Sequence, residues 1–275
     1  TERTDDEEEK ESDLEYSLTY RKTYEQKGHE FTADVRYEEN QEKEGSVFEE
    51  VYFDNEFNML DTTDFNQLSN NEEGEKRLGA KLDYVRPFGK DGKFEVGYQG
   101  SFREIKNDYV VRQLINGEEI IDPNFTNNFI YEENIHALYT SYGNKIDKFS
   151  YQIGLRGEYS DVKTELVTTD SINDRQYTNL FPSVFFTYDL PAQNLIQLSY
   201  SRRIRRPRFW DLNPFFTLSD RRNTFSGNPD LDPEFTNSYE LTHIKYWEKG
   251  SLSSSIYYRH TDGAIQRIRT LDETN

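Results

Sequence analysis

The chain has 275 residues, enough for one large domain or two ordinary ones, and its 52 acidic and 33 basic residues give a formal net charge of −19. This charge repels a phosphate backbone and argues against nucleic-acid binding, while the absence of cysteine excludes disulfides and thiolate metal sites. The 20 tyrosines and 19 phenylalanines argue against a disordered chain.

The first residues, TERTDDEEEKESD (1–13), form an acidic segment without the basic and apolar regions of a signal peptide. We expect residues 1–13 to be a solvated, disordered end or a loop remnant. The run Asp5 to Glu9 carries enough charge to attract a divalent cation. However, it has neither the spaced ligands nor the glycine turn of a calcium loop.

From Leu14 onward, apolar residues alternate with polar ones in seven segments, with the period of two that is typical of β-strands. The apolar rows are Leu14, Tyr16, Leu18 and Tyr20; Phe31, Ala33, Val35 and Tyr37; Leu78, Ala80, Leu82 and Tyr84; Phe94, Val96, Tyr98, Gly100 and Phe102; Tyr151, Ile153, Leu155, Gly157 and Tyr159; Val184, Phe186 and Tyr188; and Ile196, Leu198 and Tyr200. None of these residues is charged, whereas the opposite rows include Glu15, Arg36 and Lys81. The pattern predicts strands with one face against an apolar medium and the other against water.

The connections between these segments alternate in length. Short turns at 25–30, 88–93, 143–148, 190–194 and 248–250 alternate with long polar connections near 54–76, 111–130, 163–177 and 204–234. Outer-membrane barrels have this parity, with short periplasmic turns and long extracellular loops. We therefore predict an all-β, antiparallel up-and-down transmembrane β-barrel portion. Its ten strands lie near 14–24, 31–48, 77–86, 94–110, 131–142, 149–162, 178–189, 195–203, 235–247 and 251–262.

Aromatic residues near the predicted strand ends, such as Tyr16, Tyr84 and Tyr188, fit the girdles that such barrels place at the lipid headgroups. No run of 18 apolar residues occurs, so the sequence predicts no membrane helix. The alternative is a soluble, secreted β-sandwich that binds carbohydrate and whose aromatic rows form its core.

The segment SYSRRIRRPRFWDLNPF (199–215) concentrates arginines in an acidic chain. Because LPAQN is a short turn, the strand from Leu195 to Arg203 is expected to run outward, and the arginines then open the longest extracellular loop. They either pair with acidic neighbours and organise that loop or bind an anionic ligand or lipopolysaccharide. The candidate ligand-binding or loop-organising residues are Arg203, Arg205, Arg206, Arg208, Trp210 and Asn213.

Four segments in fixed order resemble the outer-membrane β-barrel family of TonB-dependent-receptor-like proteins of Gram-negative bacteria. They are LFPSVFFTYDL (180–190), IQLSYSRRIRRPRFWDLNPFF (196–216), SGNPDLDPEFTNSYEL (226–241) and SSSIYYRHTDGAIQRI (253–268). The resemblance implies an outer-membrane location and contact with outer-membrane lipid. It also implies ligand capture by extracellular loops, a plug domain inside the barrel, and energy-coupled uptake through an inner-membrane energy transducer.

The sequence departs from a complete member of that family, since it shows no plug, no energy-coupling motif and no terminal aromatic residue. Its first strand is expected to run inward and its tenth outward, which favours an internal piece of a larger barrel of about 22 strands over a complete small barrel of ten. We accordingly expect an acidic end at 1–13, a barrel portion at 14–268 and a truncated end at 269–275.

No catalytic chemistry is predicted. The histidines His29, His136, His243 and His260 are isolated, and no nucleophile elbow, phosphate loop or metal-ligand spacing occurs. We expect a protein that is not an enzyme, that uses no cofactor or metal, and that takes a small-molecule or oligomeric substrate that the sequence does not identify.

Overall fold

The computed structural model describes residues 2–51, 53–54, 56, 58–59, 65–115, 118–215 and 225–269. Almost all of them belong to one antiparallel sheet in which consecutive strands are neighbours. The main strands are β1 (Glu2–Thr23), β2 (Glu30–Val51), β3 (Phe65–Phe88), β4 (Gly92–Ile115), β6 (Asn127–Ile146), β7 (Phe149–Leu166), β8 (Ser171–Leu190), β9 (Asn194–Arg205), β10 (Glu234–Trp247) and β11 (Gly250–Asp262). The predicted up-and-down order of ten strands is thereby confirmed. One further strand, β5 (Glu118–Ile121), was not predicted and pairs with the upper part of β4.

The register gathers all seven predicted apolar rows on one face of the sheet, which we call the outer face. Leu18 is opposite Val35, which is opposite Ala80, and the same face continues through the paired residues Ile153 and Val184. These side chains are largely exposed, and Leu18 retains 73% of its accessible surface. Exposing so many large apolar side chains to water is costly, at about 25 cal/mol per Å², whereas lipid contact removes that cost.

The strands are longer than predicted. Above the apolar band β1, β2 and β3 stay paired through polar residues such as Glu11, Glu42 and Glu73. Both faces meet water there, so alternation disappears while backbone pairing continues. The acidic segment 5–9, expected to be a disordered end, therefore lies within β1. The aromatic residues Tyr16 and Tyr37 mark the edge of the apolar band and not the strand ends.

The short turns lie at one end of the sheet, as predicted. At the other end the connections vary, and the long connection predicted at 163–177 is wrong. There, β7 continues to Leu166 and β8 begins at Ser171, with only the 3₁₀ turn η1 (Val167–Thr169) between them. Its polar composition reflects strands that rise into water, not a loop. None of the helices described is long and apolar enough to cross a membrane.

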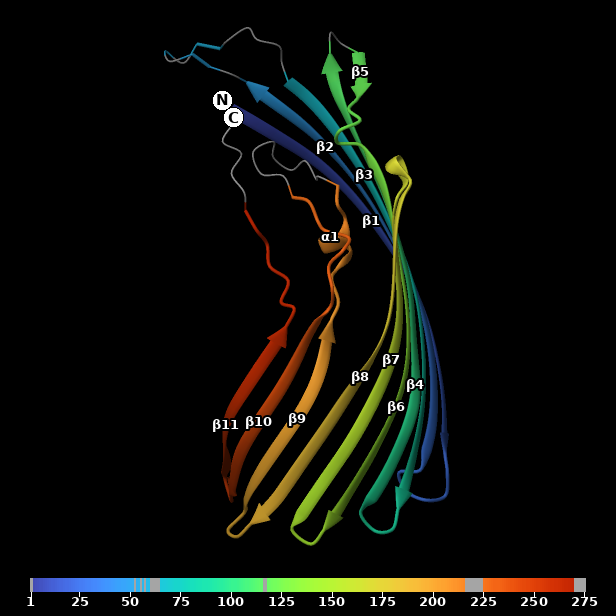
Figure 1. The fold of residues 1–275 in the computed structure, drawn as a ribbon, viewed down its shortest axis with the longest axis vertical. Helices are drawn as coiled ribbons and strands as arrows, with labels where there is room; N and C mark the ends of the chain where they lie inside the picture. The colour runs from blue at the N-terminus through green and yellow to red at the C-terminus, as the bar shows by residue number, and fades with distance from the viewer. Residues whose placement is uncertain are drawn as a thin grey trace.

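The sheet is strongly curved and open (Figure 1). Its edges are β1 and β11, which do not pair with each other over the residues that the structure describes. A single continuous sheet is incompatible with the alternative of a two-sheet sandwich, and the open edges differ from a closed barrel of ten strands. The division at residues 13 and 268 stays a prediction, and residues 270–275 of the expected truncated end lie outside the described residues.

Candidate functional site

The connection between β9 and β10, residues 206–233, folds back across the sheet. We call it the strap; the structure describes its residues 206–215 and 225–233. It lies on the face that bears the charged rows, which we call the inner face, and it contains the short helix α1 (Phe209–Leu212). Figure 1 shows α1 on the concave side of the sheet, at the end away from the short turns. The strap therefore narrows this end of the concave space.

A gap in strand pairing makes room for the strap. Although β8 spans Ser171–Leu190, it pairs with β9 only between Ser183 and Leu190. Pairing ends next to Pro182, which has no backbone N–H to donate and is tolerated at such an edge. Above this point β8 remains paired with β7 alone, and the strap lies beside its free edge.

The underside of the strap is apolar. Phe209 and Leu212 are almost fully buried, and the Phe209 ring lies 5.4 Å from that of Phe129 and 6.2 Å from that of Tyr131, both on β6. Ile105 of β4 and Val162 of β7 complete this buried cluster. Because each buried apolar side chain contributes about 1.5–3 kcal/mol, the cluster holds the strap against strands two to four places away from β9.

Arg206 anchors the first limb of the strap to β7. Its Nη2 donates to Glu158 Oε2 at 2.6 Å and to Ser160 Oγ at 2.7 Å. Glu158 Oε1 also accepts a hydrogen bond of 2.6 Å from Nε of Arg156. The two side chains of the Arg206–Glu158 pair are only 17% and 9% exposed, so the pair is shielded from solvent.

A second set of contacts holds the returning limb to the upper part of β8. Arg175 donates from Nη1 to the backbone oxygen of Leu231 at 2.6 Å and forms an ion pair with Asp232. Asn173 Nδ2 donates to Asp230 Oδ1 at 2.8 Å. These carboxylates are more exposed than Glu158, so this attachment is the weaker one.

The two limbs of the strap are also joined to each other. The Gly227 N–H donates to the oxygen of Asn213 at 2.7 Å, and the Asn228 N–H donates to that of Asp211 at 2.8 Å. A Cβ on Gly227 would lie 2.6 to 2.7 Å from three carbonyl oxygens, so only glycine fits this crossing. At the start of α1, burial acts to raise the pKa of Asp211, but hydrogen bonds from Arg208 hold that pKa below its usual range.

The structure brings four of the six predicted site residues into the strap. Arg206 is buried against β7, Arg208 caps α1 beside Asp211, and Asn213 Oδ1 accepts a hydrogen bond from the Phe215 N–H at 3.0 Å. Trp210 is 39% exposed and packs edge-on against Phe209.

The other two predicted residues lie on the inner face of β9. Arg205 forms an ion pair of 3.2 Å with the buried carboxylate of Glu234 at the start of β10. Arg203 is exposed and contacts no carboxylate among the residues described. Arg202, in the same cluster, is on the outer face, where its guanidinium lies 5.0 Å from the Phe235 ring.

The sequence analysis did not identify the strand residues that contact the strap. Glu158, Arg175 and Tyr131 stand on the inner faces of strands more than 25 residues from the arginine cluster. One signal was present in the sequence: Ile105, Phe129, Tyr131 and Val162 are apolar residues at inner-face positions, most of which are polar elsewhere in the sheet.

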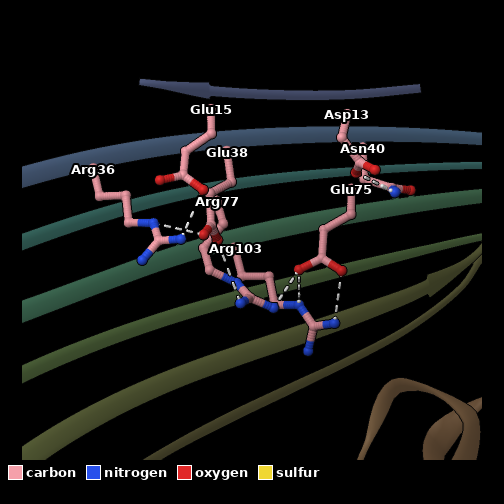
Figure 2. A network of polar contacts seen from close by, with 8 residues as sticks. All are labelled: Asp13, Glu15, Arg36, Glu38, Asn40, Glu75, Arg77 and Arg103. Carbon is pink, nitrogen blue, oxygen red and sulfur yellow. Dashed lines mark hydrogen bonds and ion pairs between the residues drawn. The ribbon is translucent and has the colours of Figure 1, made fainter. Parts of the chain in front are cut away.

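A network of acidic and basic side chains continues around the inner face on β1 to β4 (Figure 2). Arg36 bridges Glu15 and Glu38 at 2.8 and 2.7 Å. Arg103 donates from Nε and Nη2 to the two carboxylate oxygens of Glu75 at 2.7 and 3.0 Å, which is a bidentate contact. The inner face is therefore highly charged, yet most of its arginines are already paired.

The strap leaves little empty space where it meets the wall. The cavity between them, lined by Tyr131, Tyr177, Arg206 and Leu231 among others, has a volume of about 20 Å³, room for a single water molecule. No group of three or more His, Asp or Glu side chains with metal-binding geometry occurs in the described part of the chain. The arrangement is suited to shaping an opening and to non-covalent contacts.

An open, curved, antiparallel sheet with an apolar outer face and a charged inner face defines part of the wall of an outer-membrane β-barrel. Residues 22–275 match the outer membrane protein beta-barrel family, and the chain belongs to that family. It is accordingly a protein of the outer membrane of a Gram-negative bacterium.

Solved structures with a similar fold are transporters and receptors. The RagAB peptide transporter aligns with a TM-score of 0.58 at 11% identity over 94% of this chain and 31% of its own. The copper transporter OprC gives 0.56 at 13% identity, over 84% and 38% of the two chains. BauA, the ferric preacinetobactin receptor from Acinetobacter baumannii, gives 0.54 at 12% identity, over 91% and 37%.

At these identities the likeness concerns the fold alone. Together with the family match it confirms the predicted resemblance to outer-membrane barrels of this kind. The chain spans about a third of the length of each of these three structures. No curated protein sequence matches it significantly.

Proposed function

We propose that this chain is the barrel-wall portion of a TonB-dependent-receptor-like transporter. In this proposal the extracellular end captures a ligand, a plug domain occupies the barrel, and energy from the inner membrane drives uptake. The family and the fold of the matched transporters and receptors support a role in transport across the outer membrane.

The observation that carries the proposal is the inward fold of the strap. A connection that only covered the barrel could project into the medium, whereas this one is fixed to the inner wall by Arg206, Arg175 and a buried apolar cluster. It therefore shapes the entrance to the lumen. A barrel with a merely structural role would not need such an entrance.

The mechanism is binding and passage, without bond chemistry. The inner face presents charged and hydroxyl side chains that can contact a polar ligand and its plug. Many of its arginines are held in ion pairs, such as Arg36 with Glu15, so the wall keeps its shape while it contacts the ligand. The outer face supplies contact with outer-membrane lipid.

Genetics of the full-length protein tests the proposal. The gene and, separately, the gene for the inner-membrane energy transducer are deleted, and growth is compared over media that each limit one nutrient. We expect both deletions to impair growth on the same nutrient, and the full-length gene to restore it only when the transducer is present. Restoration without the transducer would overturn energy-coupled uptake.

A further inference from the structure

Two arginines of the inner face differ from the others in having no carboxylate partner among the described residues. Every other strand arginine of this face with a described side chain has a carboxylate oxygen within 4.0 Å; these are Arg21, Arg36, Arg77, Arg103, Arg156, Arg175 and Arg205. Arg203 on β9 and Arg259 on β11 have no carboxylate at that distance among the described residues. In a chain with 52 acidic and 33 basic residues, arginines without a carboxylate partner are exceptions. Both of these arginines stand where their strand has a neighbour on one side only among the described residues, since β9 pairs with β8 no further than Ser201 and β11 is an edge of the sheet.

The register places these two arginines on one patch. Arg203 is opposite Thr236 of β10, and Arg259 is opposite Ser238 of the same strand. Thr236 and Ser238 are two residues apart and point to the same face. The arginines therefore flank the β10 hydroxyls from the two neighbouring strands, on either side of β10.

The residues paired with one another around these two arginines carry hydroxyl groups. Ser201 is opposite Ser238 on the β9 side, and Thr261 is opposite Thr236 on the β11 side. The hydroxyls of Thr236 and Thr261 lie 2.8 Å apart and hydrogen bond to each other. We call Arg203, Arg259, Ser201, Thr236, Ser238 and Thr261 the arginine–hydroxyl patch.

The side chain of Arg259 makes a cation–π contact with a neighbouring tyrosine. The Arg259 guanidinium lies 4.9 Å from the centroid of the Tyr257 ring, which is itself 65% exposed on the inner face. This contact orients the guanidinium without neutralising it. Two carboxylates of β10 share this face, and each already accepts a hydrogen bond or forms an ion pair. Glu240 accepts a hydrogen bond of 3.1 Å from Thr242 Oγ1, and Glu234 pairs with Arg205.

We propose that the arginine–hydroxyl patch binds an anionic group of a ligand that enters the barrel, either a carboxylate or a phosphate. Guanidinium forks donate paired hydrogen bonds to the oxygens of both groups, and the hydroxyls supply further donors. The patch adjoins the base of the strap, because Arg205 and Glu234 are the last residue of β9 and the first residue of β10, on either side of the strap. The anion-binding proposal goes beyond the proposed function because it names the chemistry of the ligand. It rests on the proposed function only in treating the inner face as the lumen of the barrel.

The surrounding charge explains why the site would be selective. With a formal net charge of −19, the protein repels anions at long range, so only groups that make short contacts with both arginines would be held. Lipid is an unsuitable source of the anion, because the patch lies on the face opposite to the apolar rows. A soluble ligand is the occupant that this placement favours.

The test measures binding to the purified, full-length protein in detergent by calorimetry, with inorganic phosphate and succinate as separate probes. The double variant Arg203→Gln/Arg259→Gln removes both unpaired charges. The control Arg36→Gln/Arg77→Gln removes two paired arginines of the same face. Folding of each variant is checked by the heat-dependent shift in gel mobility that folded barrels show.

We expect the wild type to bind at least one probe, with affinity that falls as salt is raised. The patch variant should lose about tenfold or more in affinity, since charge-assisted hydrogen bonds are lost, while the control should stay within about twofold. Equal loss in both variants, or no binding of either probe by the wild type, would overturn the proposal. Because the assay contains no energy source, its result is independent of whether uptake requires the energy transducer.

Discussion

Arg206 and Glu158 form an ion pair of 2.6 Å that joins the connection after β9 to β7, two strands away across the inner face. Both side chains are largely buried, so neither can be removed without leaving the other charge short of a partner. Together with the buried apolar cluster, the pair holds the strap against the barrel wall.

Replacing Arg206 should release the strap. Removing one partner of a buried ion pair costs about 3–5 kcal/mol, so Arg206→Ala should make the strap open to added protease on whole cells. Arg208 is the matched control, because it is exposed and pairs only with Asp211 within the strap. Equal cleavage of the two variants would contradict the anchoring role.

The crossing at Gly227 predicts a steric effect. Gly227→Ala would bring a methyl group to within 2.6 to 2.7 Å of the oxygens of Trp210, Asp211 and Asn213, so the two limbs must separate. The variant should lower the thermal midpoint of the strap's protease protection. Gly45→Ala is the control, since a Cβ at Gly45 meets nothing within 4 Å, and its midpoint should equal that of the wild type.

Introducing an arginine should affect membrane assembly differently on the two faces of the sheet. Arginine at Leu82 or Leu198 should hinder assembly in the outer membrane, because a charge at the bilayer midplane costs about 2–4 kcal/mol. Arginine at Lys81 or Gln197, the inner-face neighbours, should be mild. Assembly is read as the amount of folded protein in outer-membrane fractions, and similar losses on both faces would argue against lipid contact.

Glu73 predicts a dependence on pH. It lies on the inner face of β3 beyond the apolar band, where burial, together with the nearby charges of Glu42 and Glu75, raises its pKa from 4.5 to about 7. Between these values the unfolded chain gives up a proton that the folded protein keeps, so stability falls as pH rises from about 4.5 to 7 and then levels off.

The variant Glu73→Gln should therefore match the wild type in unfolding midpoint near pH 4 and exceed it at pH 8. The control Glu72→Gln removes an exposed carboxylate on the other face, which pairs with Lys43. A difference between Glu73→Gln and the wild type that is the same at both pH values would show that Glu73 does not titrate in this window.

The strand order, the faces and the short turns could be predicted from sequence because lipid and water impose alternation on each strand separately. Leu82 and Lys81 report their faces through their immediate neighbours alone. Strand length was harder to predict, because beyond the lipid the strands are polar on both faces. Glu11 on the inner face and its neighbour Ser12 on the outer face are an example, and such a segment is interpreted from sequence as a loop or a disordered end.

The strap's attachment could not be predicted for a different reason. The partners of Arg206 and Phe209 are set by the curvature of the sheet, which brings β6 and β7 beneath a connection that begins on β9. The arginines were identified as candidates, but nothing local in the sequence shows that Arg206 reaches Glu158 while Arg203 reaches no carboxylate among the described residues.

The orientation of the chain in the outer membrane is tested most directly by cysteine labelling on intact cells. The 275 residues contain no cysteine. Trp210→Cys in the strap and Ala192→Cys in the turn between β8 and β9 therefore serve as single reporters in a full-length protein whose cysteines outside this segment, if any, are replaced by serine. A membrane-impermeant maleimide should label the strap on intact cells and the turn only after the outer membrane is permeabilised. Labelling of the turn but not of the strap on intact cells would contradict the account.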